Sequence, residues 1–472
     1  MRPSLSVAAF IACVITGMTG AAAGLELGTP FRDHMVLQRD KPLPVWGWAE
    51  PGDEVTVKFA GQSKSVKAGD DGRWMMRLDP LATNASPSVL TVNSGRSGGP
   101  LEVADVLVGE VWLGSGQSNM AMQVSRAARF DEEKGAADKP LIRMFRESSS
   151  GAARPQPRGA GEWTVCSPDT VGGFSATLYF LGRELHAALG VPIGLINSSV
   201  GGTPIQAWIE ESVQRASPPL APCLAAIDAE RAAFDRAATQ ARFDKAVDAW
   251  TAATQKARRE GRPAPARPKN PVEKHDRDTV GGLYHGKIAP LVPYAVRGAV
   301  WYQGEGNAHP GKGDFYRHQL PLLVTSWREA WGDGFPFAWV QLPNFNGGRT
   351  GEDWMLVREG MLETLALPQT GMAITVDIGD PQDIHPKNKQ DVGRRLAAWA
   401  LADVYGREVP ARSGPLPAGH EIRGSEVVCR FSDAAGLRDR DGGDLEGFSI
   451  AGGDRQWHPA RARIEGTTVV VS

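Results

Sequence analysis

Five short apolar runs, separated by stretches with helical spacing, constrain the fold of this 472-residue chain more than any other feature. The runs lie at residues 106–113, 192–196, 296–302, 337–342 and 372–376. Helical patterns occupy residues 178–189, between the first two runs, and residues 389–405, after the last run. Strands that are apolar on both faces and alternate with helices are typical of a parallel sheet covered by helices. The central part of the chain is therefore predicted to be an α/β domain.

The segments on either side of this region have a different period. Apolar and polar residues alternate at Val55, Val57 and Phe59, as in half-buried strands, and turn residues separate such runs. Short β segments return at residues 426–431, 447–450 and 467–471. We predict a β-sandwich domain at residues 24–103, the α/β domain at 104–406 and a C-terminal β domain at 407–472. The chain stops inside the last β segment, so this domain is expected to be incomplete.

An Ala-rich, charged stretch at residues 224–259 interrupts the α/β pattern between two predicted strands. Four prolines follow it, at positions 263, 265, 268 and 271, and proline cannot continue a helix. The spacing predicts a helical insertion over about residues 210–275, which serves as a packing or lid element.

The first 23 residues have the order of regions found in a secretory signal. Arg2 precedes an apolar run at residues 7–18, and small residues follow at Ala21-Ala22-Ala23. The run is shorter than the roughly 20 residues that a membrane-spanning helix needs, which disfavours the alternative of a membrane anchor. The mature protein is predicted to be secreted or periplasmic and free of the membrane.

Charge and cysteine content exclude several function classes. The chain has 52 basic and 54 acidic residues and a net charge of -2, so it lacks the electropositive footprint of a nucleic-acid-binding protein. Cys166, Cys223 and Cys429 are too few and too scattered for a disulfide framework or a zinc site. We predict no metal and no cofactor.

Polar and glycine-rich segments follow four of the five predicted strands. In open parallel sheets, ligands bind outside the carboxyl ends of the strands, so these segments are expected to meet. They are Gly114-Ser115-Gly116-Gln117-Ser118-Asn119-Met120, Asn197-Ser198-Ser199-Val200-Gly201-Gly202-Thr203, Gln303-Gly304-Glu305-Gly306-Asn307-Ala308-His309 and the run from Asp377 to Pro386.

Together these segments supply the groups that acyl transfer requires. A serine hydroxyl needs a base to remove its proton, and the oxyanion that forms needs preorganised donors. Ser118 supplies the hydroxyl, and His385 can act as the base. The backbone N–H of Ser118, an N–H of Gly201 or Gly202 and the amide of Asn307 are candidate oxyanion donors.

The same segments resemble the conserved blocks of the sialate O-acetylesterase-like family of SGNH (GDSL-like) hydrolases. The resemblance rests on Gly116-Gln117-Ser118-Asn119-Met120, Gly201-Gly202-Thr203-Pro204-Ile205 with Trp208, Trp301-Tyr302-Gln303-Gly304-Glu305 with Asn307, and Ile384-His385-Pro386-Lys387-Asn388-Lys389. It implies a flavodoxin-like sheet with flanking β-sandwich domains. It also implies Ser118 as nucleophile, Asn307 and a glycine of the pair 201/202 as oxyanion donors, and His385 as general base.

The chain departs from the family pattern at the third member of the triad. Common SGNH enzymes place an aspartate three residues before the histidine, where this chain has Gln382. A catalytic histidine needs an acceptor at its other ring nitrogen. Asp383 is our first choice, with Asp380 or a backbone carbonyl near Gln382 as alternatives. Gly306 and Val200 also differ from many relatives, which predicts a different pocket rim.

Other polar residues of these segments are assigned supporting roles. Gln117, Gln303 and Glu305 are expected to support their loops. His309 is a rival base because it follows the same strand as Asn307, and His285 is a second rival in a loop that we expect to be packed.

The sequence thus predicts a secreted carbohydrate O-acetylesterase that acts on an O-acetylated sugar or polysaccharide through an acyl-enzyme. The resemblance suggests a sialate 9-O-acetylesterase. The alternatives are an acetylxylan or xyloglucan acetylesterase with the same mechanism, or a carbohydrate-binding protein whose hydrolase site has decayed. The sugar and the oligomeric state depend on loop contacts that the sequence leaves open.

Overall fold

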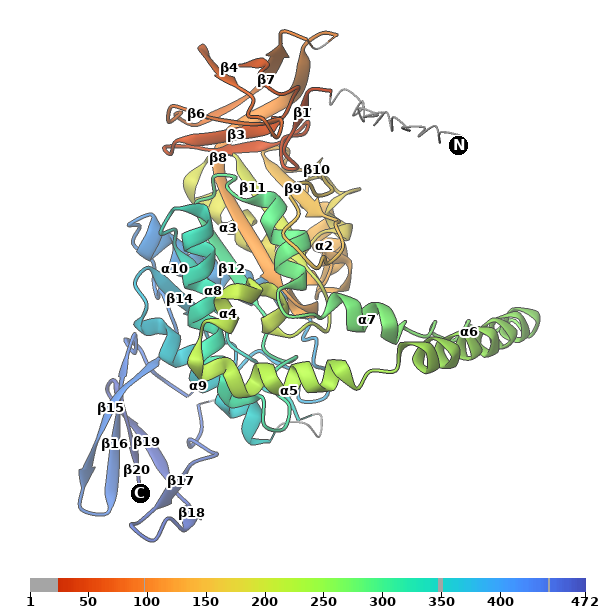
Figure 1. Cartoon of the computed structure of the whole chain (residues 1–472). Helices are drawn as coiled ribbons and strands as arrows, with labels where there is room; N and C mark the ends of the chain where they lie inside the picture. Colours follow the sequence, from red (N-terminus) through yellow and green to blue (C-terminus); the bar gives the residue numbers. More distant parts are fainter. Residues whose placement is uncertain (1–23, 97, 347–350, 440–441) are drawn as a thin grey trace, which may run out of the picture.

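The computed structural model describes residues 24–96, 98–346, 351–439 and 442–472, with a mixed sheet at its centre (Figure 1). Its seven main strands run in the order β10-β9-β11-β8-β12-β13-β14, and all neighbours are parallel except β9 and β10. Their bounds are β8 (Leu101–Gly116), β9 (Ile142–Glu147), β10 (Gly161–Val165), β11 (Ile193–Ser199), β12 (Gly298–Tyr302), β13 (Phe337–Val340) and β14 (Thr370–Ala373). The α/β class is therefore confirmed.

The five predicted apolar runs coincide with β8, β11, β12, β13 and β14. Numbered in chain order, these five strands lie in the spatial order 2-1-3-4-5, which is the order of flavodoxin-like sheets. Several bounds differ from the prediction. β8 extends to Gly116, so Gly114, Ser115 and Gly116 lie within the strand and not after it. β11 extends to Ser199, so Asn197 lies within the strand, and β14 ends at Ala373, three residues before the predicted end.

β9 and β10 were not predicted from the sequence. Three charged residues hide the apolar character of β9; Arg146 is exposed, and the other two are buried with partners. Arg143 donates to the Asp105 carboxylate at 2.6 Å, and Glu147 forms an ion pair with Lys287. Buried charges require such pairing, so β9 is a central strand in spite of its composition.

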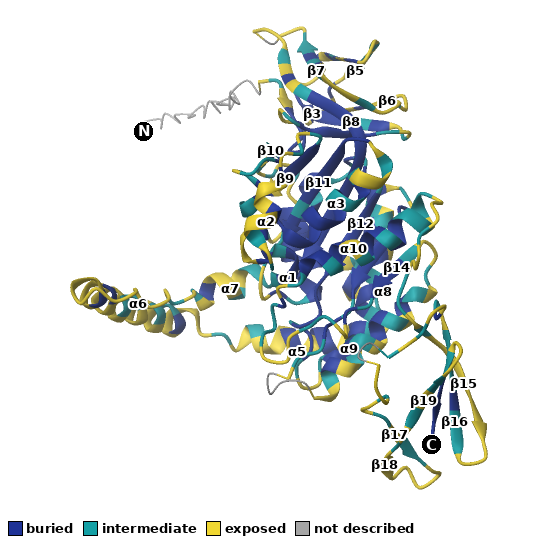
Figure 2. Ribbon diagram, turned by 180° about the vertical axis from the view of Figure 1, so that it is seen from behind, coloured by how far each residue is buried: buried dark blue, intermediate teal, exposed yellow. Residues whose placement is uncertain are grey.

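Helices cover both faces of the sheet, and the buried strands lie between them (Figure 2). On one face, α3 (Ala176–Leu189) and α10 (Lys389–Trp399) pack with Trp112, Leu195 and Val300. On the other face, α8 (Tyr316–Trp331) packs with Trp301 and Trp339, and α9 (Glu352–Glu363) lies beside α8. The cover on both faces explains why the strands read as continuous apolar runs.

The strand β8 belongs to two regions of the molecule. Its first half pairs with β7 (Asn84–Ser94) and β2 (Val36–Gln38), and its second half pairs with β11 and β12. The expected domain boundary between residues 103 and 104 falls inside this strand. The division into domains at that point stays a prediction, and no linker marks it.

Small antiparallel sheets flank the central sheet at both ends of the described chain. At the N-terminal end, β1 (Glu26–Leu27), β3 (Leu43–Trp48) and β6 (Arg73–Leu78) form one sheet, while β4 (Glu54–Phe59) and β5 (Gln62–Lys67) extend the edge at β7. The alternating residues of β4 and β6 point into one core, as the period predicts. The predicted signal at residues 1–23 lies outside the described residues.

The C-terminal region forms a four-stranded sheet in the order β15-β16-β20-β19 and a separate pair, β17-β18. Their bounds are β15 (Leu416–Arg423), β16 (Glu426–Ser432), β17 (Ser449–Ala451), β18 (Trp457–Pro459), β19 (Ala462–Glu465) and β20 (Thr468–Val471). Val469, Val470 and Val471 are buried, whereas Ile422 and Trp457 are exposed. The predicted β segments of this region coincide with β16, β17 and β20.

The helical insertion consists of α4 (Glu211–Arg215), α5 (Ala221–Ala232), α6 (Arg236–Arg259) and α7 (Pro271–Arg277). α6 projects from the body of the molecule (Figure 1). The Pro-rich segment after it returns along the helix, since the indole N–H of Trp250 donates to the Pro265 carbonyl at 2.8 Å. The segment then brings residues 267–270 back to the body, where the site lies.

Candidate active site

Ser118 lies at the turn from β8 into α1 (Ser118–Ala121), where it is half-buried between buried neighbours. Gly116 makes this turn possible. Its φ is +134°, and a Cβ at this position would lie 2.2 Å from the Tyr302 carbonyl oxygen. Only glycine fits such a conformation and such a close approach to backbone. The Gln117 N–H donates to the same carbonyl at 2.9 Å, which fixes Ser118 at the edge of the sheet.

The glycine pair follows β11 on the neighbouring strand, and its two members differ. A Cβ on Gly201 would lie 3.4 Å from the Ser118 Cβ, so Gly201 is in contact with the candidate nucleophile. Gly202 has a φ of +72°, and a Cβ there would meet nothing within 4 Å. Of the two candidate donors, the structure brings Gly201 to Ser118.

Asn307 lies in the loop after β12 and is buried. Its Oδ1 accepts from the Ile205 N–H at 2.9 Å and from Gln303 at 2.8 Å. Its Nδ2 donates to Gln206 at 3.1 Å and to Gln319 at 3.4 Å. Both amide N–H groups are thus engaged within the protein, so its role as an oxyanion donor stays a prediction.

The glutamines expected to support the loops have buried side chains. Gln117 Oε1 accepts from the Gly306 N–H at 3.0 Å, which joins the serine turn to the loop after β12. Gln303 donates to the Thr203 carbonyl at 3.2 Å and accepts from the Tyr316 hydroxyl at 3.1 Å. These contacts hold the loops after β8, β11 and β12 together.

Glu305 is buried and contacts the residue after the candidate nucleophile. Its Oε1 accepts from Asn119 Nδ2 at 2.5 Å, and burial raises the pKa of its carboxyl. The same Asn119 amide donates to the Ile384 carbonyl at 2.9 Å. Asn119 therefore joins the serine turn to the loop that carries His385. Sequence reasoning missed this role, although Asn119 stands inside the first conserved block.

Two aspartates, Asp383 and Asp380, lie in the loop before His385. Asp383 Oδ1 accepts from the His385 backbone N–H at 2.9 Å and lies 3.9 Å from Nδ1 of the ring. Asp380 Oδ1 accepts from the backbone N–H groups of Gln382 and Asp383, at 2.9 and 3.3 Å. The first choice, Asp383, thus lies beside the imidazole, at a distance longer than a hydrogen bond. The assignment of the triad acid stays a prediction.

His385 is partly exposed, with 30% of its side chain accessible. Burial lowers the pKa of its imidazole, and the Asp383 carboxylate opposes this shift. Three nearby cations lower the pKa further, those of Lys389, Arg126 and Lys269. A lowered pKa keeps the ring neutral at neutral pH, which is the form a general base requires.

The rival histidines are held in other ways. The backbone N–H of His309 donates to the Asn307 carbonyl at 2.8 Å, within the loop after β12. His285 is buried in the π-helical turn η5 (Tyr284–Ile288), with Nδ1 3.3 Å from the Ala152 carbonyl oxygen. His285 is therefore in a packed loop, as expected.

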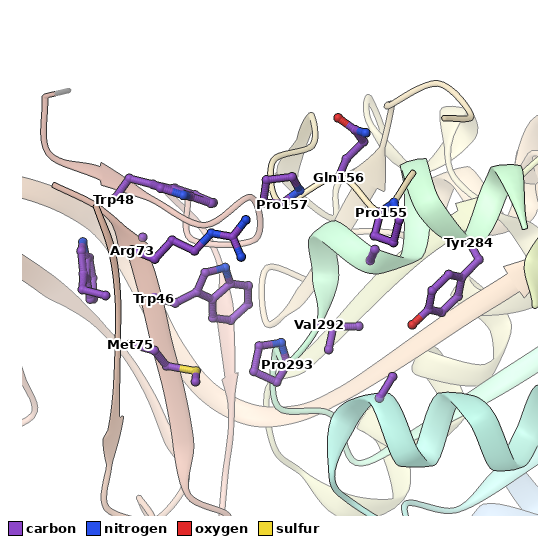
Figure 3. Close-up of a pocket in the computed structure, with 14 residues that line it drawn as sticks. Trp46, Trp48, Arg73, Met75, Pro155, Gln156, Pro157, Tyr284, Val292 and Pro293 are labelled. Atoms are coloured by element: carbon purple, nitrogen blue, oxygen red, sulfur yellow. The ribbon is translucent and has the colours of Figure 1, made fainter. Parts of the chain in front are cut away.

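Two cavities lie near features of interest. One of about 620 Å³ opens beside Gly201 and Gly202 and is lined on its other side by Arg267 and Lys269 of the Pro-rich segment. Another, of about 680 Å³, lies between the N-terminal sheet and the central body (Figure 3). Trp46, Trp48 and Tyr284 line it, and none of the predicted site residues does. The first cavity is the candidate substrate cleft because the glycine pair lines it, although neither Ser118 nor His385 is among its lining residues.

The described residues contain no group of three or more His, Cys, Asp or Glu side chains that could hold a metal ion. Within the same part of the chain, no helix is long and apolar enough to cross a membrane. The described contacts bring Gly201 to Ser118 and join the serine turn to the residue before His385.

Comparison with known proteins places the chain among carbohydrate esterases. Residues 108–233 match the family model described as "Carbohydrate esterase, sialic acid-specific acetylesterase". The sialate O-acetylesterase of Rattus norvegicus is 28% identical over 96% of this chain and 87% of its own length. The human sialate O-acetylesterase is 29% identical over 89% of this chain and 79% of its own length.

A solved structure is similar over nearly the whole chain. The crystal structure of a carbohydrate acetylesterase from Xanthomonas citri has 37% sequence identity and a TM-score of 0.78, and the match covers 95% of this chain and 90% of that one. The protein is thus a carbohydrate esterase. The chain belongs to the sialate O-acetylesterase-like family, and it is a carboxylic ester hydrolase that removes acetyl groups from carbohydrates.

Proposed function

We propose that this enzyme cleaves sugar acetyl esters through an acyl-enzyme on Ser118. His385 takes the hydroxyl proton while Ser118 Oγ attacks the acetyl carbonyl carbon. The tetrahedral species collapses, the sugar leaves as an alcohol with the proton from His385, and the acetyl group remains on Ser118 Oγ as an ester. Water, deprotonated by His385, then releases acetate and restores the hydroxyl.

The observation that carries this proposal is the convergence of three loops on Ser118. Gly201 lies in contact with it, and the Asn119 side chain ties the turn to the residue before His385. We assign the backbone N–H groups of Ser118 and Gly201 as oxyanion donors. Asn307 is the third, provided that it gives up its 3.4 Å bond to Gln319, which is the longest of its contacts.

Asp383 is proposed to orient the imidazole and to stabilise its protonated form. A small rotation of either side chain closes the 3.9 Å gap, and the backbone bond from His385 keeps the carboxylate beside the ring. The Asp380 carboxylate accepts instead from the backbone N–H groups of Gln382 and Asp383, in the turn before His385.

The mechanism is tested by acetate release from a chromogenic acetyl ester. Ser118→Ala is expected to lower kcat by about 10⁶-fold, as removal of a triad serine does. Ser125→Ala, an exposed serine in the nearby 3₁₀ turn, serves as the control and keeps the wild-type rate. If Ser118→Ala is as fast as wild type, the acyl-enzyme on Ser118 is wrong.

We also propose that the sugar carries a carboxylate, as a sialic acid does. Lys269 lines the cleft beside Gly201, and Arg126 follows the serine turn in η1 (Val124–Arg126). Both side chains are exposed, both act on His385, and neither has a carboxylate partner among the described residues. Two unneutralised cations beside the site attract an anionic substrate.

The substrate class is tested by the ratio of kcat/KM for 9-O-acetylated sialic acid to that for acetylated xylan. Lys269→Ala is expected to lower kcat/KM for 9-O-acetylated sialic acid about tenfold, which is the value of one charged hydrogen bond. It should leave kcat/KM for acetylated xylan unchanged. Lys245→Ala, an exposed lysine of α6, is the matched control. Equal losses on both substrates, or a wild-type preference for xylan, would favour a neutral plant-wall ester.

Export of the enzyme belongs to the same proposal. The pattern of residues 1–23 supports a cleaved signal, and a secreted or periplasmic enzyme would meet acetylated glycans outside the cytoplasm. N-terminal sequencing of the mature protein tests it, with Gly24 as the expected first residue.

A further inference from the structure

A fully buried lysine, Lys389, lies behind the proposed catalytic residues, and the mechanism does not use it. It is the first residue of α10. Its Nζ donates to Asn119 Oδ1 and to the Pro386 carbonyl, each at 2.7 Å, and lies 5.3 Å from the centre of the Tyr302 ring. Burying an ammonium group costs free energy unless it is hydrogen-bonded, so these contacts determine whether the lysine is tolerated there.

The partner of Lys389, the Asn119 side chain, makes three hydrogen bonds to three different segments. Its oxygen accepts from Lys389, and its nitrogen donates to Glu305 and to the Ile384 carbonyl. Because Asn119 directly follows Ser118, these hydrogen bonds hold Lys389, Glu305 and the Ile384 carbonyl at fixed places relative to the nucleophile.

The two backbone carbonyls that flank His385 are both bound by this pair of side chains. Asn119 binds the Ile384 carbonyl, and Lys389 binds the Pro386 carbonyl. The backbone of His385 is therefore held on both sides from the serine turn, although the loop before it is exposed.

We propose that Lys389 is a positioning residue, which sets the place of the His385 imidazole relative to Ser118 by binding Asn119 and the Pro386 carbonyl at once. The inference rests on the proposed roles of Ser118 and His385. A misplacement of about 1 Å between reacting groups can cost about 100-fold in rate, so a loop held from one side only is expected to be much slower.

The charge of Lys389 supplies a second, independent signature. The charged groups that act on His385 are the carboxylate of Asp383, which raises its pKa, and the cations of Lys389, Arg126 and Lys269, which lower it. Burial lowers the pKa of Lys389 itself to about 7, against the effects of Glu305 and Asp383. Removing Lys389 takes away one of the cations near the ring, so the pKa of His385 rises.

The test compares Lys389→Met with Lys387→Met on the full chain. Lys387 stands in the same loop with an exposed side chain, so it is the matched control. Active sites are counted by reacting Ser118 to completion with a phosphonate and measuring, by mass spectrometry, the fraction of the protein that carries the label. For Lys389→Met we expect kcat per labelled site to fall about 100-fold, KM to stay within about threefold, and the acid limb of kcat/KM to move to higher pH. Lys387→Met should match wild type in all three.

A merely structural role would leave a different record. The number of labelled sites and the melting temperature would fall, while kcat per labelled site and the acid limb stayed at wild-type values; that result overturns the proposal. Should Lys389→Met fail to fold, Asn119→Ser removes the same bond from the other side, and an unchanged kcat per labelled site again overturns it. Failure of the proposed function is recognised separately, because the wild-type enzyme would then not be labelled at Ser118.

Discussion

The two loops that complete the site beside Ser118 are held in opposite ways. In the loop after β12, the side chains of Gln303, Glu305 and Asn307 are buried and bonded to other side chains or to backbone. In the loop that carries His385, the side chains of Asp380 and Gln382 are at the surface, and the anchors are its backbone carbonyls. Changes in the first loop should therefore cost stability as well as rate, whereas changes in the second should cost rate alone.

The largest effect is expected from His385→Ala, which removes the proposed base. We expect kcat/KM to fall by about 10⁴-fold or more, with a change in melting temperature too small to measure, because the side chain is partly exposed and the loop keeps its carbonyl anchors. Ester hydrolysis and thermal unfolding on the same preparation check both parts. If His309→Ala is slower than His385→Ala, the base is His309 instead.

Asp383→Asn should have the next largest effect, a loss of about 100-fold or more in kcat. Asparagine keeps the oxygen that accepts from the His385 backbone but removes the charge. Since that charge raises the pKa of His385, the acid limb of kcat/KM should also move to lower pH, where the neutral ring becomes available. Asp380→Asn is the control. A normal rate for Asp383→Asn with a slow Asp380→Asn would transfer the triad role.

Asn307→Ala tests the loop after β12. The loss of one oxyanion donor costs about 2.7 to 4 kcal/mol of transition-state stabilisation, or roughly 100- to 1000-fold in kcat. Four buried partners also lose a hydrogen bond, so the free energy of unfolding should fall by about 2 kcal/mol or more. Urea denaturation and kcat are measured together; a stability loss with full activity per folded molecule would reduce Asn307 to loop support.

The smallest effect is expected from the glycine pair. Gly201→Ala places a methyl group 3.4 Å from the Ser118 Cβ and should slow turnover about tenfold by crowding the acyl group. Gly202→Ala meets no neighbour but strains a positive φ, so it should lower stability by about 1 kcal/mol at unchanged kcat. If Gly202→Ala slows turnover while Gly201→Ala lowers only stability, Gly202 is the oxyanion donor.

The sheet and the candidate site residues could be predicted from the sequence because both depend on residue type and spacing. The five apolar runs became five strands of the sheet, and the segments after three of them contact the turn over residues 116–120. β9 was not visible because the partners that neutralise Arg143 and Glu147 lie far away in the chain. The hydrogen bonds from Asn307 to Gln206 and from Lys389 to Asn119 also join distant segments, which no local pattern encodes. Lys269 comes to the cleft through the path of a Pro-rich segment, for which periodicity gives no signal.

The continuity of β8 links the register of the N-terminal strands to the accuracy of catalysis. The strand pairs with β7 from Leu101 to Val108 and carries Ser118 two residues beyond its end at Gly116. A slip of one residue along this strand would displace the nucleophile by about 3.3 Å and turn alternate side chains to the opposite face. The pairing of β8 with β11 and β12 keeps Ser118 beside Gly201, and the same strand joins this register to the pairing with β7.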